Sequence, residues 1–484
     1  MQTIQVTHKP QTLRRRPKRR LYEIDFGGKK VHMIGVGGCG MRAAARLLMQ
    51  CGATVTGSDR AAFAGLGMLT DFGAKVYLGQ CAANIPDGAD LVVYSAAVPD
   101  SNEELRAARA SGGRVIKYAQ LIGELMQLRT GVAIAGTHGK STTTALCAHL
   151  FRVAGLDPSF IIGANVPQLR GGSGVGMGQH FVVEACEFDR SFLHLRPKCA
   201  AILNIEADHL DCYKDIGEIC EAFAAFAGNV ASDGLIVTDH EDRHAAGAVG
   251  GASARVETFG FGPDATWRAV NLEIDRGRYT FDVTYESLHL FRTSLSIAGR
   301  HNVTNALAAT ALAWNVGASR EALAEGLCSF EGVDRRMSHR GCCCGVNLVD
   351  DYAHHPSEIR VTLAAARDRF APRRVWVVFQ PHQHSRTRIL MDEFAKSFDL
   401  ADEVIIPRVY GSRDTQQEVD RNGARTLATR IGDNGTNVHY IPELEDVATF
   451  LEFRLAPDDL VITMGAGDVW KLADELVERL QRQA

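Results

Sequence analysis

The sequence predicts an α/β protein built from parallel sheets with helices on their faces. Short apolar segments alternate with helix-like segments along most of the chain, a pattern typical of β/α units. Two of these apolar segments, ending near residues 34 and 135, lead into glycine-rich turns that open helices. A chain of 484 residues is also long enough for about two to four domains, each with its own core.

The first segment contains a glycine-rich turn with the G-x-G-x-x-G pattern. This turn, GVGGCG at 35–40, follows the expected strand KKVHMI and precedes a helix expected to end near Gly52. The next strand ends at Asp59, about where dinucleotide-binding folds place the acid that binds a ribose. The pattern fits NAD, FAD or another diphosphate-bearing nucleotide, and a purely structural tight turn is the alternative.

The second glycine-rich turn, GTHGKS at 136–141, is the most informative motif. It follows the apolar run VAIA and opens a threonine-rich helix, so backbone N–H groups and the positive helix end face an anion. Lys140 adds a positive charge, and the Ser141 hydroxyl lies where a P-loop presents its ligand to Mg²⁺. The full P-loop pattern has a glycine where Ile134 stands, so this loop is a shortened version. We interpret it as a site for the phosphates of ATP, with a chance turn as the alternative.

Two later apolar segments carry candidate metal ligands. The strands expected at 180–189 and 200–211 bring Glu184 and His209 to the carboxyl edge of the sheet, where open α/β sheets bind ligands. A carboxylate and a neutral imidazole suit Mg²⁺ ions that are held mostly by substrate phosphates and water. A helix cap or a solvated loop is the alternative for a single acid, but two such side chains beside a phosphate loop favour metal binding.

A strand-rich stretch then precedes a helix expected over 299–314. Asn302 and Asn305 lie three residues apart at its start and therefore share a face. An Asn amide can pair with the edge of adenine, and capping of the helix is the alternative.

From about residue 333 the chain is predicted to form another doubly wound unit. The strand expected at 347–356 leads into a helix with Pro356 near its first position, which is a favoured place. A strand expected at 373–387 is followed by a helix through Phe398, and two more strands precede the final helix.

The composition excludes several classes of function. A formal charge of −4 argues against nucleic acid as the main partner, and the basic block at 14–20 is expected to be a disordered tail. No apolar run is long enough for a membrane span or a signal peptide. The 12 cysteines show no metal-binding spacing, so we expect small buried side chains in a reducing, cytoplasmic compartment.

Taken together, these sites resemble the Mur ligases of bacterial cell-wall synthesis over residues 29–475. The motifs that carry the resemblance are GVGGCGM at 35–41, GTHGKSTTT at 136–144, NIEADHLD at 204–211, GRHNVTNALAA at 299–309, DDYAHHPSE at 350–358 and FQPH…SRT at 379–387. The resemblance implies a Rossmann-like UDP-binding domain at 26–128, a central P-loop-type ATPase domain at 129–332 and a C-terminal Rossmann-like domain at 333–484, after a basic tail at 1–25.

The resemblance also implies a reaction. ATP would phosphorylate the carboxylate of UDP-N-acetylmuramate, and the amine of L-alanine would displace the phosphate to form an amide. Implied partners are these two substrates, with neither nucleic acid nor membrane, in a monomer or a homodimer. The alternatives are a ligase that attaches a ready-made tripeptide to the same sugar nucleotide, an NAD-dependent oxidoreductase and a non-catalytic nucleotide switch.

Individual residues receive roles only through this resemblance. The implied catalytic residues are Lys140, Glu184, His209, His354 and Arg386. The implied nucleotide-binding residues are Gly136, Thr137, His138, Gly139, Lys140, Ser141, Thr142, His301, Asn302, Asn305 and Asp351. The implied substrate-binding residues are Gly35, Gly37, Gly38, Gly40, Ser95, Tyr352, His354, His382, Ser385 and Arg386. The implied metal ligands are Ser141, Glu184 and His209.

The sequence departs from the family pattern at three places. Cys186 stands where the family usually has an acid, Gln383-His384 replaces an Arg-Tyr pair, and Met337 replaces an aromatic residue. The Gln383-His384 change removes a cation next to the expected amino-acid pocket. Of the properties that the resemblance implies, specificity for L-alanine is the one that this change affects most.

Overall fold

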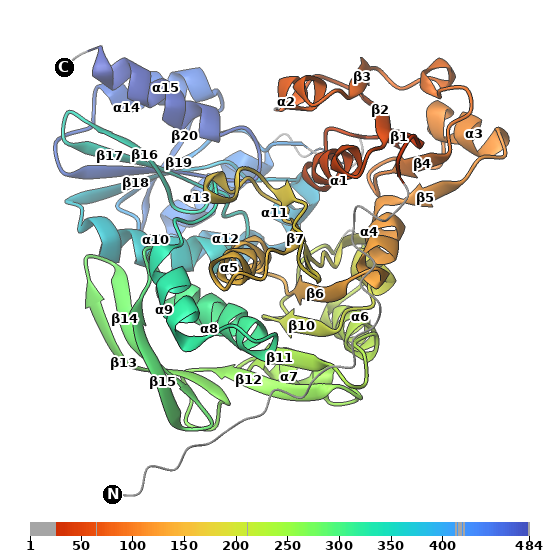
Figure 1. Cartoon of the computed structure of the whole chain (residues 1–484). Coiled ribbons are helices and arrows are strands. Elements are labelled where there is room, and N and C mark those ends of the chain that lie inside the picture. The colour runs from red at the N-terminus through yellow and green to blue at the C-terminus, as the bar shows by residue number, and fades with distance from the viewer. Residues whose placement is uncertain are drawn as a thin grey trace, which may run out of the picture.

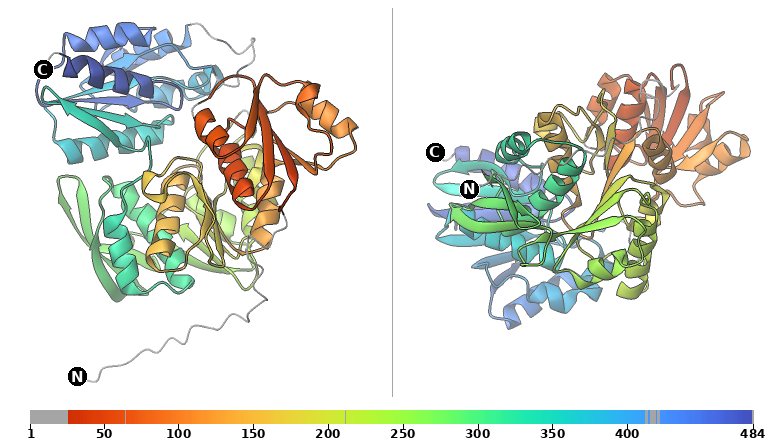
Figure 2. Two further views of the ribbon diagram at one scale, coloured as in Figure 1. Left: turned by 45° about the horizontal axis from the view of Figure 1, so that its top comes forward. Right: turned by 60° about the horizontal axis from the view of Figure 1, so that its bottom comes forward.

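Three sheets, each belonging to its own domain, make up the protein (Figure 1). The structure, a computed structural model, describes residues 26–63, 65–210, 212–411, 414, 419 and 422–482. The expected basic tail at 1–25 lies outside the described residues. Figure 2 shows the N-terminal and C-terminal domains as two separate bodies that both contact the central domain. The predicted α/β fold of three domains is confirmed.

The N-terminal domain is a parallel sheet of five strands in the order β3-β2-β1-β4-β5. In that order the strands are Lys75–Leu78, Thr54–Asp59, Lys30–Ile34, Leu91–Tyr94 and Val115–Lys117. The helices α1, α2, α3 and α4 span Cys39–Gln50, Leu66–Asp71, Glu103–Ala110 and Tyr118–Gln127. The order reverses between β1 and β4, and in such folds ligands bind at the carboxyl ends of the strands beside that point.

The central domain has ten strands in the order β15-β14-β13-β12-β11-β10-β6-β9-β7-β8. Strands β6 to β10 are Thr130–Ala135, Ser159–Ile161, Ser173–Gly174, His180–Glu184 and Cys199–Ile202. Strands β11 to β15 are Leu235–Asp239, Arg255–Gly260, Trp267–Asp275, Arg278–Tyr285 and Leu288–Ser294. The α-helices α5 to α9 are Lys140–Val153, Ile216–Gly228, Arg243–Val249, Arg300–Asn315 and Arg320–Ser329. Strand β6 lies between β9 and β10, so the loops after these three strands meet at one edge of the sheet.

The C-terminal domain has six strands in the order β16-β17-β21-β18-β19-β20, of which only β16 is antiparallel to its neighbour. Strands β16 to β21 are Ser338–Cys343, Val346–Asp351, Arg374–Phe379, Glu403–Ile406, Asn437–Tyr440 and Asp459–Met464. Helices α10 to α15 are Pro356–Phe370, His384–Ile389, Met391–Ala395, Gly423–Asp433, Leu444–Glu452 and Trp470–Gln481. The single helix expected through Phe398 is wrong, because Leu390 leaves helical geometry and separates α11 from α12.

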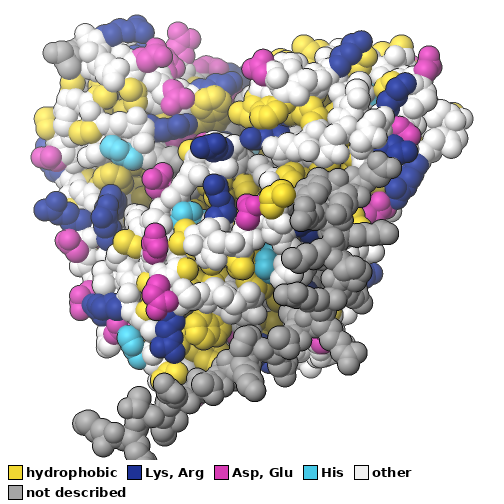
Figure 3. All heavy atoms as spheres, in the orientation of Figure 1, with side chains coloured by type: hydrophobic (Ala, Val, Ile, Leu, Met, Phe, Trp, Pro, Cys, Tyr) yellow, Lys and Arg dark blue, Asp and Glu magenta, His cyan; other side chains and the backbone are white. Residues whose placement is uncertain are grey.

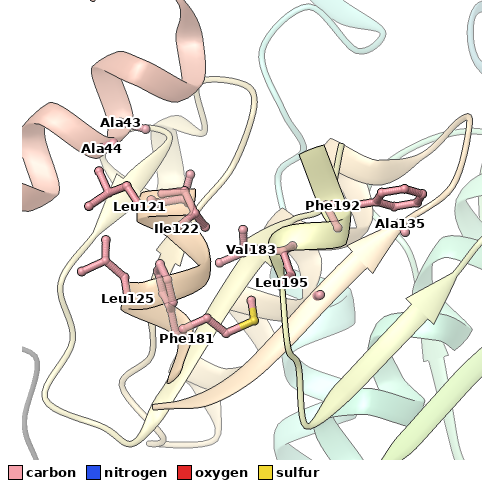
Figure 4. Packing of buried hydrophobic residues seen from close by; sticks show 14 of the residues in the cluster. Ala43, Ala44, Leu121, Ile122, Leu125, Ala135, Phe181, Val183, Phe192 and Leu195 are labelled. Atoms are coloured by element: carbon pink, nitrogen blue, oxygen red, sulfur yellow. The ribbon is translucent and has the colours of Figure 1, made fainter. Parts of the chain in front are cut away.

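An apolar cluster joins the N-terminal and central domains. Leu121 and Leu125 on α4 lie beside Phe181 on β9, and all belong to one core cluster that also includes Ala44 on α1 (Figure 4). The apolar clusters of the C-terminal domain, by contrast, contain only residues after 336 among those described. The central domain therefore holds the N-terminal domain by hydrophobic packing and meets the C-terminal domain through polar groups.

The surface agrees with the absence of a broad basic patch in the sequence. Figure 3 shows acidic and basic side chains interspersed over the described part of one face. No helix in the described ranges is long and apolar enough to cross a membrane. The expectation of buried cysteines is wrong for most of them, since seven of the 12 free cysteines are exposed and four are buried. Four of the seven exposed cysteines lie in loops, outside the helices and strands that form the apolar core.

Phe192 tests the packing that joins the first two domains. It is 1% exposed and lies on Phe226 with a centroid distance of 4.9 Å. We expect Phe192→Ala to lower the free energy of unfolding by about 3–5 kcal/mol, because it leaves a cavity in this cluster. Urea unfolding followed by fluorescence measures the change. Phe453→Ala, at a side chain that is 79% exposed, is the control and should change little; equal losses in both variants would contradict the account.

Candidate active site

The phosphate loop connects β6 to α5 and has the predicted strand–turn–helix form. Gly139 has a φ of +80°, which favours glycine, and a Cβ there would lie 2.6 Å from Asn305 Oδ1. The loop therefore needs glycine both for its backbone conformation and for its contact with α8. The Asn305 side chain consequently lies directly against the turn.

Lys140 is held across the mouth of this loop. Its Nζ donates to the carbonyls of Gly136 and Thr137 at 2.6 and 2.9 Å, and to Glu187 Oε1 at 2.9 Å. Burial alone would lower the pKa of Lys140, but the Glu187 carboxylate raises it above its ordinary value. Lys140 is therefore positively charged, and the Glu187 carboxylate lies where a phosphate group of ATP is expected.

Glu187 also meets His209, the second predicted metal ligand. His209 Nε2 lies 3.5 Å from the same Glu187 Oε1, and its Nδ1 is buried without a hydrogen-bond partner. Burial would raise the pKa of Glu187, but Lys140 and His209 lower it, so the carboxylate is charged. The sequence reasoning missed this role. Glu187 is an acid three residues after Glu184 and could have been noticed for that reason, but it lies in a loop where the sequence predicted a strand.

Ser141 and Glu184 are brought together as the sequence predicted. Ser141 Oγ donates to Glu184 Oε1 at 3.2 Å, and the backbone N–H of Gly163 donates to Glu184 Oε2 at 2.7 Å. A hydroxyl and a carboxylate side by side form a donor set that suits a hard cation such as Mg²⁺, and the unpartnered Nδ1 of His209 lies in the neighbouring loop.

The strands that carry these ligands are shorter than expected. Strand β9 ends at Glu184 instead of 189, and β10 ends at Ile202 instead of 211. The residues that follow leave the sheet in irregular loops, and His209 itself has a φ of +53°. Glu187 and His209 can approach Lys140 because they lie on loops rather than on diverging strands.

A cavity of about 680 Å³ opens between the central and C-terminal domains. The predicted nucleotide-binding residues that line it are His138, Gly139, Thr142, His301, Asn302, Asn305 and Asp351. The others, Gly136, Thr137, Lys140 and Ser141, lie in the adjoining loop and do not line this cavity.

The two asparagines of α8 do not cap their helix. No side chain caps its N-terminus, which begins after Gly299. Instead Asn302 Nδ2 donates to the Ala298 carbonyl at 2.6 Å, and Asn305 Nδ2 donates to Asn302 Oδ1 at 3.0 Å. The two amides share one face, as predicted, and this face lines the cavity.

Burial sets the charge of two other groups in this cavity. It lowers the pKa of His301 to about 4, with a further contribution from Arg336, so the imidazole is neutral at pH 7. It raises the pKa of Asp351 to about 6, although Arg336 opposes the shift. Asp351 accepts from the N–H groups of Met337 and Ala353 at 2.7 and 2.8 Å and so fixes the start of the C-terminal domain.

Arg386 crosses the boundary between the domains. Its Nε and Nη2 donate to Asp208 Oδ1 at 3.1 and 2.9 Å, and both side chains are buried. Burial would raise the pKa of Asp208, but Arg386 lowers it far below its ordinary value. The predicted clamp for an amino-acid carboxylate is therefore already paired with an internal carboxylate. Arg386, Ser385 and His209 line one small cavity of about 20 Å³ beside this pair.

The remaining candidates of the C-terminal domain lie around Arg386. His354 Nδ1 is 3.0 Å from the Tyr352 carbonyl, and its ring lies 6.3 Å from that of His382. Burial lowers the pKa of His354 to about 4, so this imidazole is neutral. Ser385 Oγ donates to Asp414 Oδ1 at 3.0 Å.

The departures from the family pattern are accommodated in the backbone around this group. Gln383 is buried with a φ of +73° immediately before α11, and its N–H donates to the Tyr410 carbonyl at 3.0 Å. The His384 N–H donates to Asp414 Oδ2 at 2.9 Å. Cys186 is an exposed thiol between Glu184 and Glu187.

The glycine-rich loop of the N-terminal domain is held against the ends of β2 and β4. Gly35, Gly37 and Gly38 lie between β1 and α1, Gly40 lies in the first turn of α1, and the Gly37 N–H donates to Asp59 Oδ2 at 2.8 Å. Ser95 lies beside this loop, since a Cβ at Gly35 would be 3.1 Å from that of Ser95.

Three family profiles match successive parts of the chain. The Mur ligase family catalytic domain matches residues 30–130, the Mur ligase middle domain matches 134–313, and the Mur ligase glutamate ligase domain matches 335–467. UDP-N-acetylmuramate–L-alanine ligase of Clostridium novyi is 40% identical over 451 residues, which cover 93% of this chain and 97% of its own length. The Salinibacter ruber protein of the same name is 40% identical over 455 residues, covering 94% and 95%.

Two solved structures also resemble the protein along most of its length. The UDP-N-acetylmuramate–alanine ligase of Thermotoga maritima has a TM-score of 0.81 at 28% identity, covering 94% of this chain and 100% of its own. A murein peptide ligase of Psychrobacter arcticus has a TM-score of 0.72 at 26% identity, covering 94% and 99%. The sequence motifs, the geometry of the site and these similarities agree, and the chain belongs to the Mur ligase family.

Proposed function

We propose that this protein joins L-alanine to UDP-N-acetylmuramate at the expense of ATP, as a step of peptidoglycan synthesis. The observation that carries the proposal is that the phosphate-loop cation Lys140 and His209 share the Glu187 carboxylate, while Ser141, next to Lys140, bonds to Glu184. Relatives at about 40% identity over almost their whole length bear the name of this reaction. A second cation, Arg386, lies in the cavity next to His209.

The chemistry explains why these residue types gather here. A free carboxylate is a poor acyl donor, so one of its oxygens first receives the γ-phosphoryl group of ATP, and ADP is released. The alanine nitrogen then attacks the acyl carbon, the bond from that carbon to the phosphate oxygen breaks, and phosphate and a proton leave. Several negative oxygens must be held together for the first transfer, so positioning and cationic stabilisation carry most of the catalysis.

Lys140 contributes the charge of the phosphate loop. In the absence of nucleotide its Nζ is neutralised by Glu187 and braced by two loop carbonyls. We infer that the β- and γ-phosphates take the place of the Glu187 carboxylate at Nζ. The adenine would then lie in the cavity beside Asn302 and Asn305, whose amides lie on the face of α8 that lines this cavity.

Ser141, Glu184 and His209 are the residues that would hold Mg²⁺. The ion would offset the negative charge of the phosphates and the sugar carboxylate as they come together. The loop of Gly35 to Gly40 with Ser95 would bind the UDP group. Tyr352, His354 and His382 would face the muramyl group from the C-terminal domain.

Arg386 would bind the carboxylate of the amino acid. The guanidinium forms a fork that matches a carboxylate, and Ser385 and His209 line the same small cavity of about 20 Å³. All of these residues come from one chain, so a monomer or a homodimer would carry complete sites. We place the reaction in the cytoplasm, where its nucleotide substrates are made.

The reaction itself is tested by supplying ATP, Mg²⁺, UDP-N-acetylmuramate and either L-alanine or the tripeptide. We expect phosphate release and amide product only when the sugar nucleotide and L-alanine are both present. Lys140→Ala is the inactive control, because it removes the phosphate-loop cation while α5 can still form. Preference for the tripeptide would assign the recycling reaction, and NADH turnover without phosphate release would refute ligase activity altogether.

Arg386→Ala should chiefly weaken the use of L-alanine. Loss of a bidentate, charge-assisted contact predicts that KM for L-alanine rises at least about tenfold, with a smaller effect on KM for ATP. Steady-state kinetics with each substrate varied in turn measure the two KM values. Arg388→Ala, two residues along α11 with an exposed side chain, is the matched control. An unchanged KM for L-alanine in the Arg386 variant would place the clamp elsewhere.

Glu187→Gln should destabilise the nucleotide-free protein. Lys140 then loses its charged partner in a buried setting, which is worth about 3 kcal/mol in the free energy of unfolding. Phosphates of ATP restore an anion at Nζ, so the rise in melting temperature on adding ATP and Mg²⁺ should exceed that of the natural protein. Thermal unfolding with and without nucleotide measures both effects.

Glu475→Gln is the control for this substitution, because it removes a partly exposed partner of Arg479 on α15. It should cost less than about 1 kcal/mol and leave the ATP-dependent stabilisation unchanged. A loss in the Glu187 variant no larger than in this control would show that Lys140 does not depend on that carboxylate.

A further inference from the structure

Three side chains from two domains point their ligand atoms at one another near the phosphate loop. His138 belongs to the loop, Glu206 follows β10, and His355 precedes α10 in the C-terminal domain. One ligand atom of each lies within 4.8 Å of the other two. His138 Nε2 and His355 Nδ1 are 3.6 and 3.7 Å from Glu206 Oε2, and the two imidazole rings are 4.7 Å apart.

The two histidines are oriented by contacts at their other ring nitrogens, and the Glu206 carboxylate is held by a serine hydroxyl at the oxygen that faces them. His138 Nδ1 faces Glu358 Oε1 at 3.3 Å, and His355 Nε2 lies 3.4 Å from the Ala207 carbonyl. Ser357 Oγ donates to Glu206 Oε2 at 2.6 Å. Metal-bound histidines are usually held in this way, with the second ring nitrogen donating to a carboxylate or a carbonyl.

Of the atoms that face the centre, the two histidine nitrogens have a weak hydrogen bond or none, whereas Glu206 Oε2 accepts the bond from Ser357. His138 Nε2 is buried and has no hydrogen-bond partner. His355 Nδ1 accepts only a long contact of 3.4 Å from the Ser357 N–H. Burial would lower the pKa of His138, but the Glu206 and Glu358 carboxylates raise it to about 9, so a metal ion bound here would displace a proton from this imidazole.

We propose that His138, Glu206 and His355 bind one divalent transition-metal ion of the Zn²⁺ type. Bonds of about 2.1 Å in a tetrahedral site set the ligand atoms about 3.4 Å apart, so two of the three separations need to shrink by only a few tenths of an ångström. Two imidazoles and one carboxylate form a common zinc donor set, and the fourth position opens towards the cavity that His138 and Glu206 line.

The site is separate from the Mg²⁺ ligands proposed above. Ser141, Glu184 and His209 belong to the central domain alone and share no residue with this cluster. An ion bound by His138 and His355 connects the phosphate loop to the first turn of α10. It therefore ties the central domain to the C-terminal domain at the one boundary that apolar packing does not secure. The inference does not depend on the ligase reaction, since binding of the ion is measured directly.

Titration of the metal-free full-length protein with Co²⁺, without nucleotide or Mg²⁺, tests the proposal. We expect one ion per chain with the intense visible absorption of four-coordinate Co²⁺, and displacement of this signal by Zn²⁺. Glu206→Gln and His355→Gln should each weaken binding at least tenfold. His289→Gln on β15 and His209→Gln at the Mg²⁺ ligands are the matched controls, and both should retain the signal.

X-ray absorption of the Zn²⁺-loaded natural protein provides a measurement that needs no variant. It should show nitrogen and oxygen ligands with the scattering pattern of two imidazoles. Sulfur ligands would instead place the ion on exposed cysteines and overturn the assignment. So would a Co²⁺ signal that survives His355→Gln and Glu206→Gln in folded protein, or one that His209→Gln abolishes, or the absence of any four-coordinate signal.

Discussion

A buried lysine beside a phosphate loop needs an anion, and in this protein Glu187 supplies it. Removing both charges from water is costly, and only their close contact and the two loop carbonyls at Lys140 Nζ offset that cost. The same arrangement recurs at Arg386, which is paired with Asp208. In each case a carboxylate of the protein is paired with the cation to which we propose that a substrate anion binds. The site is therefore stable when empty and ready to exchange one anion for another.

The two domain boundaries differ in a way that suits this exchange. The N-terminal domain is joined to the central domain by an apolar cluster around α4, which has one close-packed arrangement. The C-terminal domain meets the central domain through ionic and hydrogen-bonded contacts such as Arg386–Asp208 and Ser357–Glu206. Polar contacts of this kind can be remade around a bound nucleotide, whereas an apolar core cannot be opened without exposing it to water.

Local sequence patterns predicted much of the fold and the centre of the site. Alternating apolar segments and glycine-rich turns predicted the α/β domains, and the end of β9 placed Glu184 beside the phosphate loop, because parallel strands end at one edge of a sheet. His209, by contrast, lies on the loop after β10 and not at a strand end. The partners Glu187 and Asp208 were not predicted. The Arg386–Asp208 bond joins residues 178 positions apart, and no local pattern encodes such a contact. The exposure of the cysteines likewise depends on tertiary packing.

The central claim is that phosphate takes the place of the Glu187 carboxylate at Lys140. A crystal structure with a non-hydrolysable ATP analogue, Mg²⁺ and UDP-N-acetylmuramate tests it most directly. The account predicts that Lys140 Nζ contacts the β- and γ-phosphates, with Ser141, Glu184 and His209 turned towards the same phosphates. A triphosphate bound elsewhere, with the 2.9 Å contact between Lys140 and Glu187 unchanged, would contradict it.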